Sequence, residues 1–159
     1  MDMIISRIPM TQQAYDRLSQ ELDVLKKVER PDIISEIATA RAQGDLSENA
    51  EYHAAKEKQG HLEAKIAELE DKVNRAEIVG TGAGNAEHIV FGAIVSVKNL
   101  GNNNVQEYTL VGPEDVDVVT GKISSVSPIG KSLLGKKPGD VVEVQIPKGT
   151  LRLEILNYK

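Results

Sequence analysis

Cysteine and tryptophan are absent from this chain of 159 residues, and phenylalanine occurs once. The absence of cysteine excludes a disulfide framework, a thiolate zinc site and a cysteine nucleophile, and it suits a reducing compartment such as the cytoplasm. Because aromatic residues are scarce, a packed core must be built from Val, Ile and Leu, and we expect part of the chain to be elongated. No segment approaches the roughly 20 apolar residues of a membrane span, so we expect no membrane association.

An excess of basic residues is also lacking, because the net charge is -5. The residues before 78 include 11 basic and 16 acidic side chains, and the remainder has 8 of each. Broad binding to a nucleic-acid backbone needs a face rich in lysine and arginine. Any contact with nucleic acid must therefore be local.

Two series of apolar residues in the first half follow the spacing of three and four that is typical of a coiled coil. The first is Tyr15, Leu18, Leu22 and Leu25, continuing less regularly through Val28, Ile33, Ile34 and Ile37, and the second is Leu62, Ile66, Leu69, Val73 and Ala76. Antiparallel pairing, such as Leu22 with Leu69, gives residue numbers that add up to 91 at every pair. The sequence therefore predicts a two-helix hairpin that reverses between Asp45 and Leu46.

The predicted hairpin is a long, thin arm. About thirty residues on each side of the reversal point, at about 1.5 Å per residue, give a length of roughly 45 Å. Small alanines near the reversal point predict that the arm narrows toward its tip. Pro31 removes a hydrogen-bond donor and disfavours helical geometry at Arg30, so we expect a kink or short break there.

Two carboxylates, Asp45 and Glu48, fall at the predicted tip in the stretch GDLSENAEY. On one helical turn their Cβ atoms would lie about 5 to 6 Å apart, close enough to meet one hard cation. Such a Mg²⁺ site is sparse and needs further ligands from a partner. Alternatively, Asp45 and Glu48 form a capping box that starts the second helix. The pair His53 and Glu57 has no visible third ligand and is more typical of a surface contact than of a metal site.

The second half predicts a small domain of another kind. Residues 79–88, VGTGAGNAEH, are rich in glycine and predict a linker between a hairpin at 1–78 and a domain at 89–159. The stretch SPIGKSLLG predicts a short helix over the sheet, with Ser127 as N-cap, Pro128 first and Gly135 at the end. The fold class is α+β. Short β-branched runs predict an antiparallel sheet with strands at 89–97, 105–111, 116–119, 141–146 and 151–156.

Residues 44–59, GDLSENAEYHAAKEKQ, closely resemble the tip signature of the Gre transcript cleavage factors. The resemblance continues through ERPDIISEIATAR, VFGAIVSV and SPIGKSLLGKKPGD, so it covers the whole chain. We identify the chain as similar to this family, and the few basic residues along the arm favour the subtype that acts on short extruded RNA over the more basic subtype.

The resemblance implies that the protein is an accessory factor and not itself an enzyme. The hairpin would enter the secondary channel of bacterial RNA polymerase, where Asp45 and Glu48 would help to hold a second Mg²⁺ and its attacking water. The polymerase would then cut the extruded RNA 3′ end. Mg²⁺ would be bound only in the complex, with no tightly bound cofactor. Further residues in the matching segment are candidates for positioning the RNA end or supporting the tip, with a solvated helix surface as the alternative: Arg41, Asn49, Tyr52 and Lys56.

For the second half, the resemblance implies a fold like that of the FK506-binding proteins, which docks on a coiled coil at the rim of the polymerase channel. The candidate contacts are Ser127, Pro128, Ile129 and Gly130, although helix capping explains Ser127 and Pro128 equally well. We expect a monomer when the protein functions.

Two other interpretations stay open. An inhibitor of the same channel would use the same architecture, but an intact pair of Asp45 and Glu48 argues against it. An acidic coiled-coil interaction protein without any link to RNA would need only the capping box at the tip.

Overall fold

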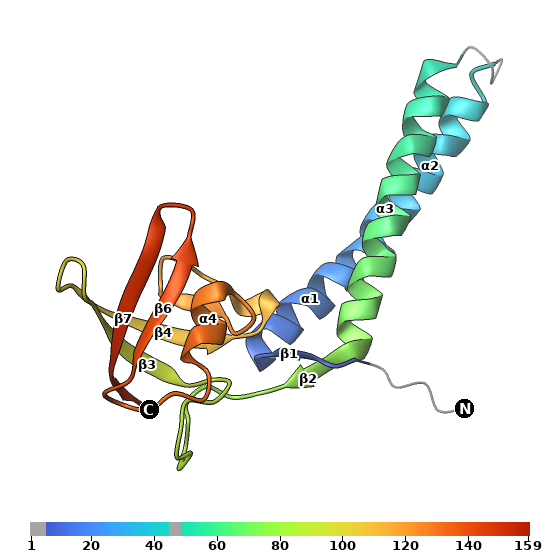
Figure 1. The fold of residues 1–159 in the computed structure, drawn as a ribbon. Coiled ribbons are helices and arrows are strands. Elements are labelled where there is room, and N and C mark those ends of the chain that lie inside the picture. Colours follow the sequence, from blue (N-terminus) through green and yellow to red (C-terminus); the bar gives the residue numbers. More distant parts are fainter. Residues whose placement is uncertain (1–5, 45–48) are drawn as a thin grey trace, which may run out of the picture. The chain divides into compact units, whose positions relative to one another are not determined.

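The computed structural model describes residues 6–44 and 49–159, which form two compact units (Figure 1). One unit contains Ser6 and Tyr15–Ala76, and the other contains Arg7–Ala14 together with Glu77–Lys159. A short N-terminal segment therefore folds with the C-terminal half of the chain. Among the described residues, no helix combines the length and the apolar character that a bilayer span requires.

The first unit is an antiparallel helical hairpin, as the apolar spacing predicts. Its first side runs through α1 (Gln12–Val24), a π-helical turn η1 (Leu25–Glu29) and α2 (Arg30–Arg41), and its second side is α3 (Ala50–Arg75). Figure 1 shows α2 side by side with the N-terminal part of α3. The predicted reversal point falls midway between Arg41 and Ala50, within 45–48, which lie outside the described residues.

Apolar side chains from both sides of the hairpin form its core. Ile33, Leu62 and Ile66 are buried together, and Leu22, Leu25 and Ile37 pack against them. Two members of the first apolar series, Val28 and Ile34, do not belong to this core. Val28 is exposed, and Ile34 is 54% exposed. The irregular part of the first apolar series therefore contributes fewer core residues than its composition suggests.

Ion pairs flank this core and link the two sides of the hairpin in antiparallel order. Arg30 donates two hydrogen bonds to Glu63, at 2.9 and 2.8 Å, and the bonded carboxylate raises the pKa of Arg30. The Nζ of Lys26 lies 3.0 Å from a carboxylate oxygen of Glu70, and the Nζ of Lys58 lies 3.1 Å from a carboxylate oxygen of Glu36. As the residue number rises on one side of the hairpin, it falls on the other.

Pro31 does not break the helix. Arg30 keeps helical dihedral angles of φ -61° and ψ -50°, so the expectation that it leaves helical geometry is wrong. Its N–H donates to the carbonyl of Leu25, five residues earlier, which closes the wider turn η1 directly before Pro31. A proline ring clashes with the carbonyl four residues before it in an α-helix. Widening the preceding turn keeps the helix continuous, and π turns of this kind occur inside α-helices.

The second unit is built on a five-stranded sheet with the order β5-β4-β3-β7-β6. Alternate residues of its strands face the core, which includes Val95, Val97, Val144, Leu153 and Ile155. The strands are β3 (Ile94–Asn99), β4 (Val105–Val111), β5 (Lys122–Ser124), β6 (Val141–Ile146) and β7 (Gly149–Tyr158).

The sheet differs from the prediction in three respects. It is mixed, because β4 and β5 pair in parallel while the other pairs are antiparallel. The predicted strand at 116–119 is wrong: the Asp117 side chain accepts a hydrogen bond from the N–H of Val119 at 3.1 Å, which closes a local turn. The first strand begins at Ile94 and not at residue 89.

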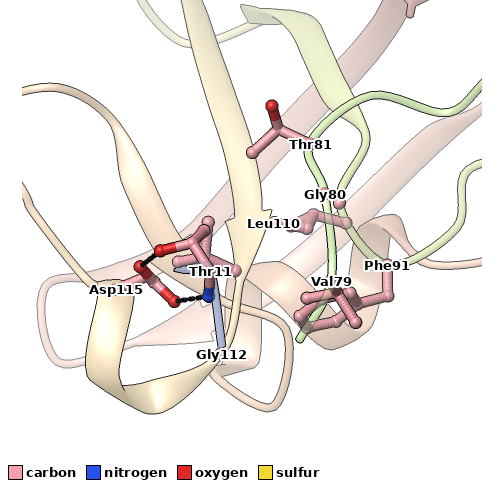
Figure 2. A pocket seen from close by; sticks show the side chains of 10 residues that line it. Thr11, Val79, Gly80, Thr81, Phe91, Leu110, Gly112 and Asp115 are labelled. Atoms are coloured by element: carbon pink, nitrogen blue, oxygen red, sulfur yellow. Dashed lines mark hydrogen bonds between the residues drawn. The ribbon is translucent and has the colours of Figure 1, made fainter. Parts of the chain in front are cut away.

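The N-terminal segment is fastened within this second unit. Strand β1 (Ile8–Met10) pairs with β2 (Ala76–Ile78), and a 3₁₀ turn η2 (Pro113–Asp115) follows β4. Figure 2 shows the hydroxyl and the backbone nitrogen of Thr11 both directed at the carboxylate of Asp115. A Cβ at Gly112 would lie 1.9 Å from the carbonyl oxygen of Pro9, so only glycine permits this approach.

Residues 79–88, expected as a linker, are hydrogen-bonded within the second unit. The N–H of Val79 donates to the carbonyl of Met10 at 2.9 Å, and the N–H of Gly82 donates to the carbonyl of Gly92 at 2.6 Å. Ala83 is buried in the core beneath the sheet. The glycine-rich composition here serves tight turns of an ordered segment.

Candidate functional site

The candidate site at the hairpin tip lies between the end of α2 at Arg41 and the start of α3 at Ala50. The two carboxylates on which the predicted chemistry depends, Asp45 and Glu48, lie outside the described residues. Their metal-binding role stays a prediction.

The start of α3 is capped by Asn49. Its side-chain oxygen accepts a hydrogen bond from the N–H of Tyr52 at 3.0 Å, and its carbonyl accepts the first helical hydrogen bond from His53 at 3.1 Å. With dihedral angles of φ -85° and ψ 95°, Asn49 itself is outside the helix. Asn49 is therefore the N-cap of α3, and the capping-box interpretation of Asp45 and Glu48 concerns residues that lie outside the described part of the chain.

The same side chain also reaches the other helix. The amide nitrogen of Asn49 donates to the carbonyl oxygen of Ala40 at 2.6 Å. Ala40 and Ala55 are 3% and 4% exposed. Small residues predominate along an open groove between α2 and α3, which is lined by Ser35, Glu36, Thr39, Ala40, Glu51, Ala54, Ala55 and Lys58.

The other predicted tip residues occupy different environments. Arg41 and Lys56 are exposed, and Lys56 donates to the side chain of Gln59 at 3.1 Å. Tyr52 is half-buried, and its ring meets that of His53 edge to face, with centroids 5.6 Å apart. Arg41, Lys56 and the exposed part of Tyr52 are open to a phosphate or a base, whereas both polar groups of the Asn49 amide are already engaged.

The pair His53 and Glu57 does not gather further metal ligands in the part of the chain that the structure describes. Glu57 lies 3.7 Å from His61, one helical turn further along α3. His53 contacts Tyr52 instead. These contacts account for both residues on the surface of α3.

The candidate docking residues surround the start of α4 (Pro128–Leu133). Ser127 caps this helix, as predicted: its hydroxyl accepts from the N–H of Gly130 at 3.1 Å and donates to the carbonyl of Ser124 at 2.7 Å. Pro128 is exposed, whereas Ile129 packs against the core and Gly130 is buried. Among these residues, Pro128 offers the most accessible surface for a partner.

Sequence reasoning missed two features of the second unit. Val118 and Val119 are 83% and 95% exposed in the loop before β5, although their β-branched side chains predicted a strand. The pairing of Thr11 with Asp115 was also not foreseen. A threonine at the start of an apolar helical series is a recognisable N-cap signal, but its distant partner leaves no local signal.

Known proteins similar to this chain are transcription factors. The family described as transcription elongation factor, N-terminal, matches residues 8–78, and transcription elongation factor, GreA/GreB, C-term, matches residues 84–159. Transcription elongation factor GreA of Thermodesulfovibrio yellowstonii is 49% identical over 151 residues, which cover 95% of this chain and 96% of that protein. GreA of Phenylobacterium zucineum is 47% identical with the same coverage. The crystal structure of GreA factor homolog 1 from Thermus thermophilus is 28% identical, with a TM-score of 0.43, over 96% of this chain and 99% of that one.

Proposed function

Because this chain belongs to the GreA/GreB family of transcription elongation factors and is most like its GreA members, we propose that it stimulates transcript cleavage by bacterial RNA polymerase. The observation that carries the proposal is a family match over both units combined with a hairpin that reverses at the acidic sequence between Arg41 and Ala50. The protein acts in the cytoplasm, where the polymerase works.

The hairpin enters the secondary channel of the polymerase with its tip leading. The helix α3 alone has 26 residues, which at about 1.5 Å per residue span about 39 Å. The ion pairs and the apolar core between its two sides keep this arm from splaying. A stiff arm of this length brings the tip to a catalytic centre inside the channel.

At the tip, Asp45 and Glu48 supply oxygen ligands, the donor type that Mg²⁺ prefers. A second Mg²⁺, when bound, supplies charge neutralisation at the scissile phosphate and activates water for an in-line attack. Two carboxylates leave most coordination positions to be filled by polymerase, RNA and water, so the metal is held only in the complex. Arg41, Tyr52 and Lys56 lie at the surface near the helix ends and hold the RNA 3′ end by phosphate contact or base stacking.

The second unit docks the protein on the polymerase at the rim of the channel. Pro128 and the exposed side of Ile129 supply the contact, and Ser127 and Gly130 shape the turn that presents them. The protein contributes ligands and positioning, while the bond is cut by the polymerase. It works as a monomer, because its own α3 already covers the apolar face of α2.

The proposal is tested with backtracked polymerase complexes whose RNA is labelled. We expect the wild-type protein to speed Mg²⁺-dependent shortening of the RNA, and Asp45→Asn or Glu48→Gln to lose about 10- to 100-fold of that stimulation while still binding polymerase. Glu57→Gln, which removes an exposed acid from α3, is the matched control and should retain full stimulation.

Equal activity in the wild type and both tip variants would reject the metal-ligand mechanism. Inhibition of RNA synthesis by the wild type without cleavage would instead identify a channel-binding inhibitor. Failure to bind polymerase would favour an acidic coiled-coil interaction protein.

A further inference from the structure

Positive charge is concentrated on α4 and the turn that follows it. Residues 126–138 contain three lysines, Lys131, Lys136 and Lys137, and no aspartate or glutamate. All three lysines are exposed. Because the chain from residue 78 onward has 8 basic and 8 acidic side chains, the rest of this half carries more acidic than basic residues. The positive charge of α4 is therefore a local feature of the second unit.

The protein does not neutralise these ammonium groups itself. Among the described residues, no ion pair or side-chain hydrogen bond involves the ammonium group of Lys131, Lys136 or Lys137. The carboxylate of Asp140, which is close in sequence, accepts from the backbone N–H of Lys137 at 2.9 Å. The lysines of the hairpin differ in this respect, since Lys26 is paired with a glutamate of the opposite helix.

Exposed apolar side chains lie next to this charge. Val126 is 66% exposed and Pro128 is exposed, on either side of the Ser127 cap. Pro128 and Lys131 are three residues apart on α4, and this spacing makes side chains neighbours on a helix surface. An apolar centre with a polar rim is the usual composition of a protein–protein interface.

The backbone that carries the lysines is held in place by hydrogen bonds. The N–H of Gly135 donates to the carbonyl of Ile89 at 2.8 Å, and the N–H of Ile89 donates to the carbonyl of Lys136 at 2.9 Å. The six residues of α4 span about 9 Å, which is close to the Debye length of about 8 Å at physiological ionic strength. Charges at the two ends of this helix therefore act together on an approaching partner.

An acidic protein surface fits this arrangement better than a nucleic acid does. Binding to a phosphate backbone strengthens with the number of basic contacts and uses a broad basic face. Three lysines offer few such contacts, and the exposed Val126 and Pro128 add apolar surface that phosphates do not use. Acidic side chains around an apolar contact match both components.

We propose that Lys131, Lys136 and Lys137 guide the second unit onto an acidic surface of RNA polymerase, where Val126 and Pro128 make the apolar contact. This inference rests on the proposed function, in which α4 docks on the polymerase, and it adds the chemistry of the surface that α4 meets. Charges at the rim of an interface act mainly on the association rate, which falls as salt rises, whereas most other contacts act on the dissociation rate.

The test measures association and dissociation rates of the full-length protein with core RNA polymerase at several salt concentrations. At low salt, we expect Lys131→Gln to associate about 2-fold more slowly and the triple glutamine variant of Lys131, Lys136 and Lys137 about 10-fold more slowly. The triple variant should also depend less on salt. Pro128→Ala should dissociate faster with an unchanged salt dependence. Lys131→Arg keeps the charge and should associate like the wild type.

Lys148 supplies the matched control. It is an exposed lysine in the turn between β6 and β7, and Lys148→Gln should keep the wild-type association rate. Thermal unfolding checks the fold of each variant, because Lys131 lies in the last turn of α4, where a cation stabilises a helix.

Several outcomes overturn the inference. One is an unchanged association rate in the triple variant, and another is an equal loss in Lys131→Gln and Lys148→Gln, which assigns the effect to net charge. If the wild type binds a labelled DNA or RNA fragment at physiological salt and the triple variant does not, the lysines serve nucleic acid instead.

RNA cleavage in backtracked complexes is measured in parallel and separates this inference from the proposed function. Salt-dependent docking by the wild type without stimulated cleavage, together with slow docking by the triple variant, rejects the proposed function and supports the role of the lysines. Stimulated cleavage by the wild type with equal association rates in the wild type and the triple variant rejects the lysine inference alone.

Discussion

Thr11 and Asp115 are 104 residues apart in the sequence and are joined by two hydrogen bonds (Figure 2). The backbone N–H of Thr11 donates to one carboxylate oxygen at 2.9 Å, and the hydroxyl donates to the other. The same hydroxyl accepts from the N–H of Ala14 at 3.1 Å, so it also caps α1. The first residues of α1, which belong to the second unit, are thereby fastened to the turn after β4.

Replacing the hydroxyl of Thr11 tests this fastening. We expect Thr11→Val to lower the free energy of unfolding by about 1 to 2 kcal/mol, because it removes both the cap and the hydroxyl's bond to Asp115 while keeping the side-chain volume. Urea denaturation of the full-length protein measures the change. Thr150→Val is the control, since the hydroxyl of Thr150 makes one exposed contact of 3.3 Å with Gln145. Equal losses in the two variants would contradict the double role of Thr11.

Gly130 is expected to tolerate no side chain. A Cβ at this position would lie 2.1 Å from the carbonyl oxygen of Ser124, so Gly130→Ala must shift the backbone and should cost roughly 1 to 3 kcal/mol. Gly60→Ala is the matched control. Apart from its chain neighbours and the backbone of its own helix, no described atom lies within 4 Å of a Cβ at Gly60 in α3, and we expect Gly60→Ala to stabilise the protein by up to about 1 kcal/mol.

The effect at Gly130 matters for any study of docking. A Gly130 variant that fails to bind polymerase would reveal lost packing and not a lost contact. Pro128→Ala, at an exposed position, is the variant that reports on the interface itself. Thermal unfolding of both glycine variants provides the check, and a stable Gly130→Ala protein would refute the packing role.

The stability of the hairpin should depend strongly on Ile66 and hardly on Ile34. Ile66 is 2% exposed between the two sides, and its truncation to alanine should cost about 2 to 5 kcal/mol. Ile34 is 54% exposed, so its replacement by alanine should leave the free energy of unfolding nearly unchanged. Helical circular dichroism during denaturation distinguishes the two, and similar losses would show that Ile34 is buried in solution.

Much of the architecture was predictable because its signals are local and periodic. The apolar series of the two helices predicted the hairpin and placed its reversal between Arg41 and Ala50. The serine and proline that open α4 predicted its cap, since capping depends on residues within one turn.

The remaining features depend on partners that are distant in sequence. The parallel pairing of β5 with β4 follows from how the connecting turn packs, and nothing in the three residues of β5 encodes a direction. At the tip, the cap formed by Asn49 was not predicted, and its side chain also donates to the carbonyl of Ala40, which is supplied only when the hairpin is closed. Local spacing alone does not reveal this contact.

The π turn before Pro31 changes the rotational positions of the apolar residues around the first side of the hairpin. Leu25 and Ile33 are eight residues apart, and at about 100° per residue an unbroken α-helix would rotate them by roughly 80° away from a common line. Both nevertheless pack in one cluster with Leu62 and Ile66. A turn closed over five residues takes up part of this excess rotation. The parts of the first side before and after η1 thus pack against α3 with separate rotational alignments. An inserted or deleted residue at η1 would rotate the apolar side chains of one part away from α3 and leave those of the other part in place.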